Sequence, residues 1–122
     1  MPLLDVLIPT YQRATALAVT LATLCGQQMR DFRIVISDQS DGGHPQASLD
    51  ASEVEACLRV LRIHGHEVEL HRRERRGIAE QRDFLLSRAR SPYALFIDDD
   101  LILEPYVLRE MRAAKDPDRK TA

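Results

Sequence analysis

The sequence predicts an α/β fold in which a mostly parallel sheet is flanked by helices. Short apolar runs alternate along the chain with longer segments whose apolar residues recur at helical spacing, and this strand–helix pair is repeated four times. A chain of 122 residues is also long enough for one domain with a hydrophobic core. We therefore expect one domain over residues 1–114, followed by a polar tail over residues 115–122.

The first two strands lie on either side of an apolar helix. Residues 6–8 form a short apolar run closed by Pro9, within a strand expected over residues 4–8, and residues 32–37 contain three consecutive β-branched residues. Between them, leucines and alanines recur at helical spacing over residues 14–28. A polar, glycine-containing loop over residues 38–43 follows the second strand. These runs predict two buried strands joined by a helix.

A second helix and an edge strand come next. Ser52 and Glu55 have the spacing of a capping box at a helix start, and Gly65 is a suitable helix stop. Residues 67–71 alternate polar and apolar side chains, which is typical of a half-exposed or edge strand.

The last third of the chain repeats the alternation. We expect a helix over residues 77–90, a buried strand over residues 93–97, and a final helix that begins near Pro105, because proline suits the first helical position. The first of these helices would have Ile78, Leu85 and Ala89 on one side, and the last helix carries Val107, Leu108 and Met111.

The composition excludes several classes of protein. The formal net charge of −2 gives no support for non-specific binding to nucleic acid or membranes. No apolar run approaches the roughly 20 residues that span a bilayer, and the N-terminus lacks the basic region of a signal peptide. Cys25 and Cys57 fall in helix-like segments without metal-ligand spacing, and no histidine has that spacing either. We expect core thiols and a cytoplasmic location.

Three adjacent aspartates, Asp98, Asp99 and Asp100, directly follow the last apolar strand. Adjacent like charges repel one another, so such a cluster usually needs a compensating partner. Mg²⁺ or Mn²⁺ is a common partner, because hard divalent cations prefer oxygen ligands and complete their shell with water or phosphate. A solvated acidic turn is the alternative.

Other polar residues are expected at the same edge of the sheet. Right-handed crossovers bring the loops that follow parallel strands to one edge, which would gather Thr10, Asp38 and the acidic cluster. The basic segment 72–76 precedes Gly77, where a helix N-terminus favours phosphate. Together these features indicate a metal-bound nucleotide diphosphate.

Each of these residues also has a purely structural interpretation. Asp38 is a common turn former, and Tyr11 could be a packed loop aromatic. The basic run over residues 72–76 could be a solvated face, and glycine at a helix start, as at Gly77, is common.

Four motifs occur in the order and spacing of a known family. They are Ile8-Pro9-Thr10-Tyr11-Gln12-Arg13, Ser37-Asp38-Gln39-Ser40-Asp41-Gly42, the helix start at residues 77–83, and the acidic cluster at residues 98–100. Over residues 4–112 the chain resembles a family-2 glycosyltransferase of the GT-A fold. The resemblance implies a Rossmann-like nucleotide-binding half and transfer of a sugar from a nucleotide donor to an acceptor hydroxyl.

The resemblance also implies roles for individual residues. The nucleotide-binding residues would be Pro9, Thr10, Tyr11, Arg13, Asp38, Arg76, Arg82 and Asp98. Asp38 would read the base, typically uracil, so the favoured partner is a UDP-type sugar. Asp98 and Asp100 would hold Mn²⁺ or Mg²⁺ on the diphosphate, and no motif indicates the acceptor.

The chain departs from the family pattern at four positions. Ser37 replaces an aspartate, Gln39 replaces a glycine, and Gln12 and Asp83 each replace an asparagine. These changes bear on the nucleotide preference more than on the fold.

The chain ends about 22 residues beyond Asp100, and Glu104 and Glu110 are the only glutamates in that stretch. The family needs a second half with a general base, so we expect a donor-binding half with little or no transferase activity and an apolar surface that favours self-association. A non-catalytic nucleotide-sugar binding module is the alternative. A phospho-acceptor signalling domain is disfavoured, because no acidic pair follows the first strand.

Overall fold

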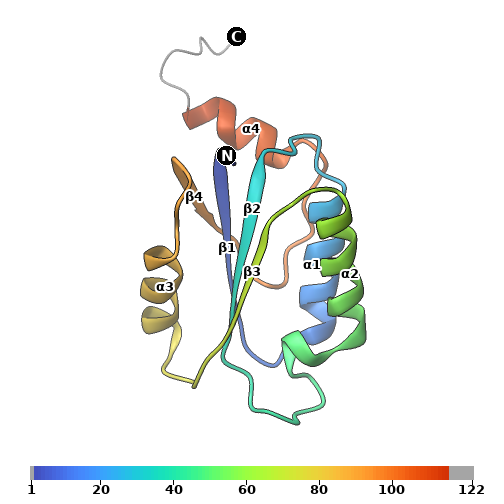
Figure 1. Cartoon of the computed structure of the whole chain (residues 1–122), viewed down its shortest axis with the longest axis vertical. Helices are drawn as coiled ribbons and strands as arrows, with labels where there is room; N and C mark the ends of the chain where they lie inside the picture. Colours follow the sequence, from blue (N-terminus) through green and yellow to red (C-terminus); the bar gives the residue numbers. More distant parts are fainter. Residues whose placement is uncertain (1, 116–122) are drawn as a thin grey trace.

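The computed structural model describes residues 2–115 and contains one four-stranded sheet between helices (Figure 1). The strands are all parallel and lie in the order β3-β2-β1-β4. Their bounds are Leu4–Thr10 for β1, Phe32–Asp38 for β2, Val68–Arg72 for β3 and Tyr93–Phe96 for β4. The helices are α1 (Ala14–Cys25), α2 (Ser52–Ile63), α3 (Ile78–Ser87) and α4 (Val107–Lys115), with a short 3₁₀ helix η1 over Ser48–Asp50. The predicted α/β fold with a parallel sheet is confirmed.

The helices cover both faces of the sheet. In Figure 1, α1 and α2 lie against one face, α3 lies against the other, and α4 crosses near the amino end of β1. No helix within residues 2–115 is both long and apolar enough to cross a membrane. Most of the predicted tail, residues 116–122, lies outside the described residues.

The strand β1 continues through Pro9 to Thr10, two residues beyond the predicted end. The carbonyl oxygen of Leu7 accepts a hydrogen bond from the backbone N–H of Ile97 at 3.0 Å, so alternate residues of β1 turn their backbone groups toward β4. The nitrogen of Pro9 faces this side too, but β4 has already ended there. The missing N–H of proline therefore costs no hydrogen bond of the sheet.

Two details of the helices differ from the sequence prediction. Ala51, with extended backbone, is the N-cap of α2, and its carbonyl accepts from the N–H of Glu55, so Ser52 lies inside the first turn. The predicted capping box is therefore wrong, and α2 begins without a side-chain cap. Ile78, expected on the same side of α3 as Leu85, is 61% exposed, because the buried stripe of α3 consists of Gln81 and Leu85, one helical turn apart.

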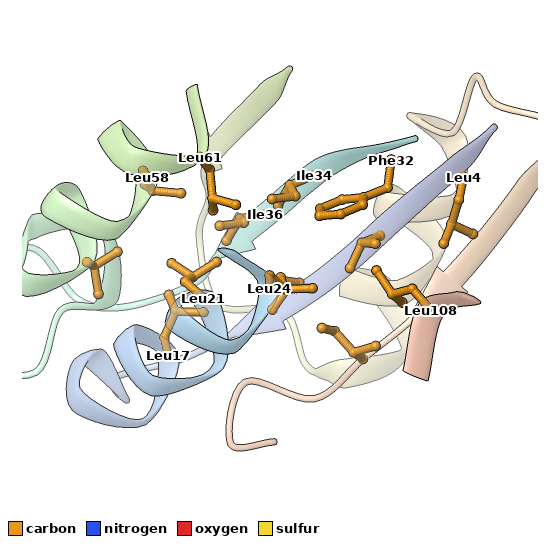
Figure 2. Packing of buried hydrophobic residues seen from close by; sticks show 14 of the residues in the cluster. Leu4, Leu17, Leu21, Leu24, Phe32, Ile34, Ile36, Leu58, Leu61 and Leu108 are labelled. Carbon is orange, nitrogen blue, oxygen red and sulfur yellow. The ribbon is translucent and has the colours of Figure 1, made fainter. Parts of the chain in front are cut away.

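The main core lies between the sheet and the pair α1 and α2. Alternate residues of β1 and β2 point to this face, where they meet leucines of the two helices and Leu108 of α4 (Figure 2). Each fully buried leucine contributes about 1.5–3 kcal/mol relative to an exposed one. The opposite face, under α3, has a smaller apolar cluster of Leu7, Val35, Leu85 and the partly buried Phe96.

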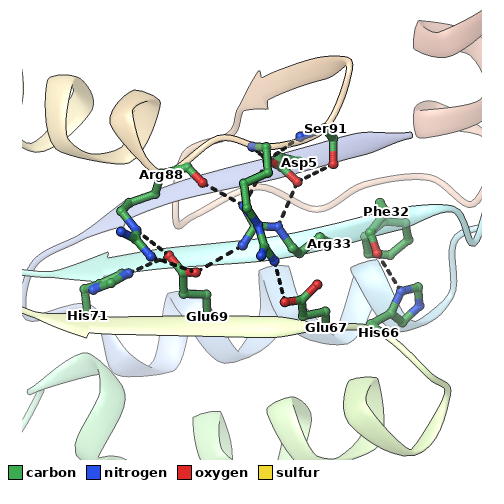
Figure 3. A network of polar contacts seen from close by, with 10 residues as sticks. Asp5, Phe32, Arg33, His66, Glu67, Glu69, His71, Arg88 and Ser91 are labelled. Carbon is green, nitrogen blue, oxygen red and sulfur yellow. Dashed lines mark hydrogen bonds and ion pairs between the residues drawn. The ribbon is translucent and has the colours of Figure 1, made fainter. Parts of the chain in front are cut away.

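Beside the smaller cluster lies a buried ion pair between Asp5 of β1 and Arg33 of β2 (Figure 3). The guanidinium forms a fork, with Nε donating to Oδ1 and Nη2 to Oδ2, each at 3.0 Å. Its Nη1 donates to Glu69 at 3.2 Å, and Glu69 also accepts from Arg88 at 2.8 Å. Asp5 further accepts from the hydroxyl of Ser91 at 2.6 Å, which ties the start of β4 to β1. We call these five residues the Asp5–Arg33 network.

Burial alone would raise the pKa of Asp5, since it disfavours the charged carboxylate. The hydrogen bonds from Arg33 and Ser91 outweigh this effect and lower the pKa well below its usual range. Both charges of the central pair are therefore fully compensated inside the protein.

Candidate functional site

A cavity lies at the carboxyl end of the sheet, where the strands end at different heights. The pairing of β1 with β4 ends at Leu7 and Phe96, whereas its pairing with β2 continues to Thr10 and Asp38. The acidic turn 98–100 lies beside the unpaired end of β1. The resulting cavity has a volume of about 360 Å³. It is lined by Pro9, Thr10, Tyr11, Arg13, Ile78, Gln81, Asp98, Asp99 and Asp100.

The three aspartates of the turn differ in environment. Asp98 and Asp100 are exposed, whereas Asp99 is buried and accepts a hydrogen bond from the hydroxyl of Thr10 at 2.8 Å. Burial raises the pKa of Asp99, and the neighbouring Asp100 adds to this effect. The hydrogen bond from Thr10 and the charge of Arg13 oppose the shift without cancelling it.

Arg13 supplies the positive charge that lies against the acidic turn. Its Nη1 is 3.2 Å from Asp100 Oδ2 and 3.6 Å from Asp99 Oδ1. The backbone N–H of Arg13 donates to the hydroxyl of Ser48, which also bonds the hydroxyl of Thr10 at 2.8 Å. The 3₁₀ helix η1, which the sequence did not predict, thus helps to fix the loop after β1.

The acidic turn has too few ligands to hold a metal ion by itself, but it fits an ion that is also coordinated by a bound ligand. Within residues 2–115, no three His, Cys, Asp or Glu side chains are grouped so as to hold a metal ion. Asp98 and Asp100 nevertheless offer exposed carboxylate oxygens to the cavity. Mg²⁺ and similar ions are commonly bound through one or two carboxylates, with the other positions filled by water and phosphate.

Asp38 lies at a neighbouring cavity of about 430 Å³, beside the basic segment that contains Arg72, Arg73 and Arg75. The residue is 4% exposed, and its carboxylate already accepts hydrogen bonds from its own loop. Oδ1 accepts from the backbone and hydroxyl of Ser40, and Oδ2 accepts from the backbone of Leu49 at 3.0 Å. Asp38 therefore organises the loop after β2, a role consistent with the turn-forming alternative.

Tyr11 and Arg75 form the boundary between the two cavities. The guanidinium of Arg75 lies 4.3 Å from the centre of the Tyr11 ring, and its Nη1 donates to the tyrosine hydroxyl at 3.2 Å. Tyr11 lines the first cavity and Arg75 lines the second. The tyrosine is thus partly buried at the site rather than packed in the core.

Arg76 and Arg82 are not among the residues that line these cavities. Arg76 pairs with Glu74 at 3.3 Å on the surface, and the guanidinium of Arg82 lies 5.1 Å from the centre of the Phe96 ring. Of the eight residues that the family resemblance assigned to the nucleotide, the first cavity brings together Pro9, Thr10, Tyr11, Arg13 and Asp98.

The sequence did not single out Gln81, a buried residue that lines the first cavity. Its Nε2 donates to the carbonyl oxygens of Ser37 at 2.6 Å and Thr10 at 3.1 Å, and so joins the ends of β1 and β2. A polar residue one turn before the buried Leu85 on an otherwise sheet-facing stripe was the signal that could have identified it.

Two backbone positions at the site have positive φ. Gly77 precedes α3 with φ of 91°, which glycine adopts without steric cost. Gln12 has φ of 48°, in the left-handed region that asparagine accepts more readily than glutamine. The Gln12 N–H donates to the hydroxyl of Ser40 at 2.7 Å, which fixes the loop after β1 against the loop after β2.

Comparison with known proteins identifies related sequences. The family model described as glycosyl transferase family 2 matches residues 5–122. The validoxylamine A glucosyltransferase of Streptomyces hygroscopicus subsp. jinggangensis (strain 5008) is 30% identical over 115 residues, which are 93% of this chain and 25% of that protein. The chondroitin synthase of Escherichia coli is 28% identical over 103 residues, 84% of this chain and 14% of that protein. The chain thus spans a quarter or less of the length of these relatives.

Solved structures share the fold. TarS of S. aureus superposes with a TM-score of 0.73 at 23% identity, over 93% of this chain and 19% of that chain. The mannosyltransferase PcManGT from Pyrobaculum calidifontis, solved in complex with GDP-Man and Mn²⁺, gives a TM-score of 0.69 at 23% identity, over 95% and 33% of the two chains. The sequence motifs, the parallel sheet and the family match over nearly the whole chain lead to one conclusion: this chain belongs to glycosyl transferase family 2.

Proposed function

We propose that the chain binds a nucleotide-diphosphate sugar together with a divalent cation, as the donor for transfer of the sugar to an acceptor hydroxyl. The observation that carries the proposal is the convergence of strand-end loops on a cavity with two exposed carboxylates, those of Asp98 and Asp100. Two structures with this fold support it, since TarS residues 1–349 were solved with UDP-GlcNAc and PcManGT with GDP-Man and Mn²⁺.

In this proposal the acidic turn holds the cation and Arg13 adds a fixed positive charge. A bound Mn²⁺ or Mg²⁺ would act as a Lewis acid that stabilises the negative charge of the departing nucleoside diphosphate. Asp98 and Asp100 are the ligands, with Asp98 also near the ribose. Asp99 stays with Thr10 and keeps the turn in place against β1.

The nucleoside end of the donor is proposed to lie toward Tyr11 and Asp38. Tyr11 offers a ring face at the boundary of the two cavities, and Asp38 lines the second cavity, where a uracil base would extend. Arg76 and Arg82 contribute positive charge near the diphosphate without lining the cavity. Residues 1–114 would thus form the domain that binds the donor.

Isothermal calorimetry with UDP tests the cation. We expect binding to be strong with Mn²⁺ and much weaker with EDTA, and Asp100→Ala to lower the Mn²⁺-dependent affinity at least about tenfold, as losses of metal-site residues commonly do. Asp31→Ala is the matched control, because it removes an exposed aspartate just before β2, at the far end of the sheet. An affinity that neither EDTA nor Asp100→Ala changes would rule out the cation site.

Asp38→Ala separates the nucleoside from the metal. This variant is expected to weaken UDP binding both with Mn²⁺ and with EDTA, whereas Asp100→Ala acts only when Mn²⁺ is present. Turnover of a UDP-sugar with an acceptor, followed by release of UDP, would distinguish a transferase from a module that only binds the donor.

A further inference from the structure

Three glutamines of the chain are buried to the same extent, each 3% exposed, but their amide groups are used differently. Gln27 uses both ends: Nε2 donates to the carbonyl of Glu104 at 2.9 Å, and Oε1 accepts from the N–H of Leu108 at 3.1 Å. Gln39 likewise donates through Nε2 and accepts through Oε1. The Nε2 of Gln81 is also occupied, but its Oε1 has no hydrogen-bond partner within residues 2–115.

The backbone fixes the orientation of the Gln81 amide. Its Nε2 lies 2.6 Å from the carbonyl oxygen of Ser37 and 3.1 Å from that of Thr10. A rotation that exchanged the two ends would bring Oε1 against these two oxygens, and acceptor would then face acceptor. The two strand ends therefore determine which way Oε1 points.

The free oxygen is accessible rather than enclosed. Within residues 2–115, the fully buried side-chain N or O atom that lacks a hydrogen-bond partner is Nη1 of Arg73, so the unpartnered Oε1 of Gln81 is not fully buried. Gln81 lines the 360 Å³ cavity together with Thr10 and the acidic turn. A fixed hydrogen-bond acceptor is therefore left open at the proposed donor site.

We propose that Gln81 is a specificity residue whose Oε1 accepts a hydrogen bond from a hydroxyl group of the bound nucleotide sugar. This inference rests on the proposed function. Phosphate oxygens are acceptors and would be repelled by Oε1, whereas the hydroxyls of the ribose and of the transferred sugar can donate to it. A buried polar group of fixed orientation discriminates against a ligand that leaves it unpaired.

The test combines one substitution with analogues of the ligand. Gln81→Met removes the amide at nearly constant volume, and Gln27→Met is the matched control, because it removes an equally buried amide whose two ends are both occupied by protein. Calorimetry with Mn²⁺ compares UDP with 2′-deoxy-UDP and 3′-deoxy-UDP for the ribose, and UDP-glucose with UDP for the transferred sugar.

In the unmodified chain and in Gln27→Met, removal of the hydroxyl that donates a hydrogen bond to Gln81 should weaken binding about two- to tenfold, the range of one neutral hydrogen bond. In Gln81→Met the same analogue should bind as well as its parent. A difference confined to the deoxy-UDP pairs assigns the ribose, and one confined to UDP-glucose assigns the transferred sugar.

Equal losses for every ligand in Gln81→Met would overturn the inference, because Gln81 would then only hold the strand ends together. If that variant does not fold, the side-chain amide resonance of Gln81 in the unmodified protein gives the answer. It should shift with UDP or UDP-glucose and shift less with the analogue that lacks the hydroxyl, and equal shifts would reject the hydrogen bond. Failure of the unmodified chain to bind any nucleotide would reject the proposed function as well, whereas binding without this coupling rejects Gln81 alone.

Discussion

Asp5 and Asp99 are both buried aspartates, yet they lie at opposite ends of the sheet and their pKa values move in opposite directions. Asp5, near the amino end of β1, receives a two-bond fork from Arg33 and a hydroxyl from Ser91, which lower its pKa despite burial. Asp99, beyond the carboxyl end of β4, is raised in pKa by burial.

The difference lies in how completely the protein pairs each charge. At the amino end the Asp5–Arg33 network supplies a donor for each carboxylate oxygen (Figure 3). At the carboxyl end Asp99 has one hydrogen bond, from Thr10, while Arg13 lies 3.6 Å away and the like charge of Asp100 lies beside it. The Asp5–Arg33 network stabilises the amino end of the sheet. The acidic turn at the carboxyl end has negative charge that the protein pairs less completely, as is common at functional sites.

The largest expected effect comes from breaking the Asp5–Arg33 ion pair at the amino end of the sheet. Arg33→Met should lower the free energy of unfolding by about 3–5 kcal/mol, because it leaves the Asp5 carboxylate buried without its partner. Urea denaturation followed by circular dichroism measures this loss. Arg88→Met is the control, since it removes a half-exposed guanidinium from Glu69 and should cost much less. Equal losses in the two variants would contradict the importance of burial.

The second largest effect is expected from acid, which should weaken the Asp5–Arg33 network at Glu69. Hydrogen bonds from Arg88 and His71 lower the pKa of Glu69 from 4.5 to about 2, despite partial burial. Because the folded-state pKa is the lower one, the stabilisation is complete above about pH 4.5 and is lost as the pH falls toward 2. Urea unfolding between pH 2 and pH 6 should therefore show a steeper acid loss in the unmodified chain than in Glu69→Gln, and parallel profiles would refute this assignment.

The smallest effect is expected from a substitution of Asp99, at the carboxyl end of the sheet. The raised pKa of Asp99 means that its favourable contribution is complete below 3.8 and is lost as the pH rises through the folded-state value. Asp99→Asn, which keeps an acceptor for Thr10, should leave stability at pH 7 unchanged or raise it by up to about 1 kcal/mol. Thermal melts at pH 7 check this, with Asp5→Asn as the destabilising counterpart. A loss as large as that of Asp5→Asn would remove the contrast between the two ends.

The sequence was sufficient for the four strands, the four α-helices and the meeting of their loops, because these follow from local periodicity and parallel connection, whereas the 3₁₀ helix η1 was missed. The β-branched run of residues 34–36 and the acidic turn after β4 were recognisable without a structure. The ion pair of Asp5 and Arg33 was not, because it joins residues 28 positions apart on neighbouring strands. The local sequence pattern placed Arg33 in a buried strand but did not indicate which residue would pair with its positive charge.

The site was predictable in its residues but less so in their contacts. The carboxylate of Asp38 is bonded to its own loop, and this depends on the path that brings Leu49 back to β2. The orientation of the Gln81 amide likewise depends on two carbonyl oxygens from different strands. Hydrogen bonds of this kind form only after the sheet is assembled, so no short pattern in the sequence reports them.

Because β4 ends before β1, the edge of the sheet has a step beside the cavity. The pairing of β1 with β4 ends at Leu7, and Ile8, Pro9 and Thr10 continue beside β2 alone. At about 3.3 Å per residue, these three residues make a step of roughly 10 Å in the edge of the sheet. Two residues inserted into β4 would keep its side chains on their present faces yet fill most of that step. The height of this step is thus set by the relative lengths of two neighbouring strands, a quantity that substitutions of the lining side chains leave untouched.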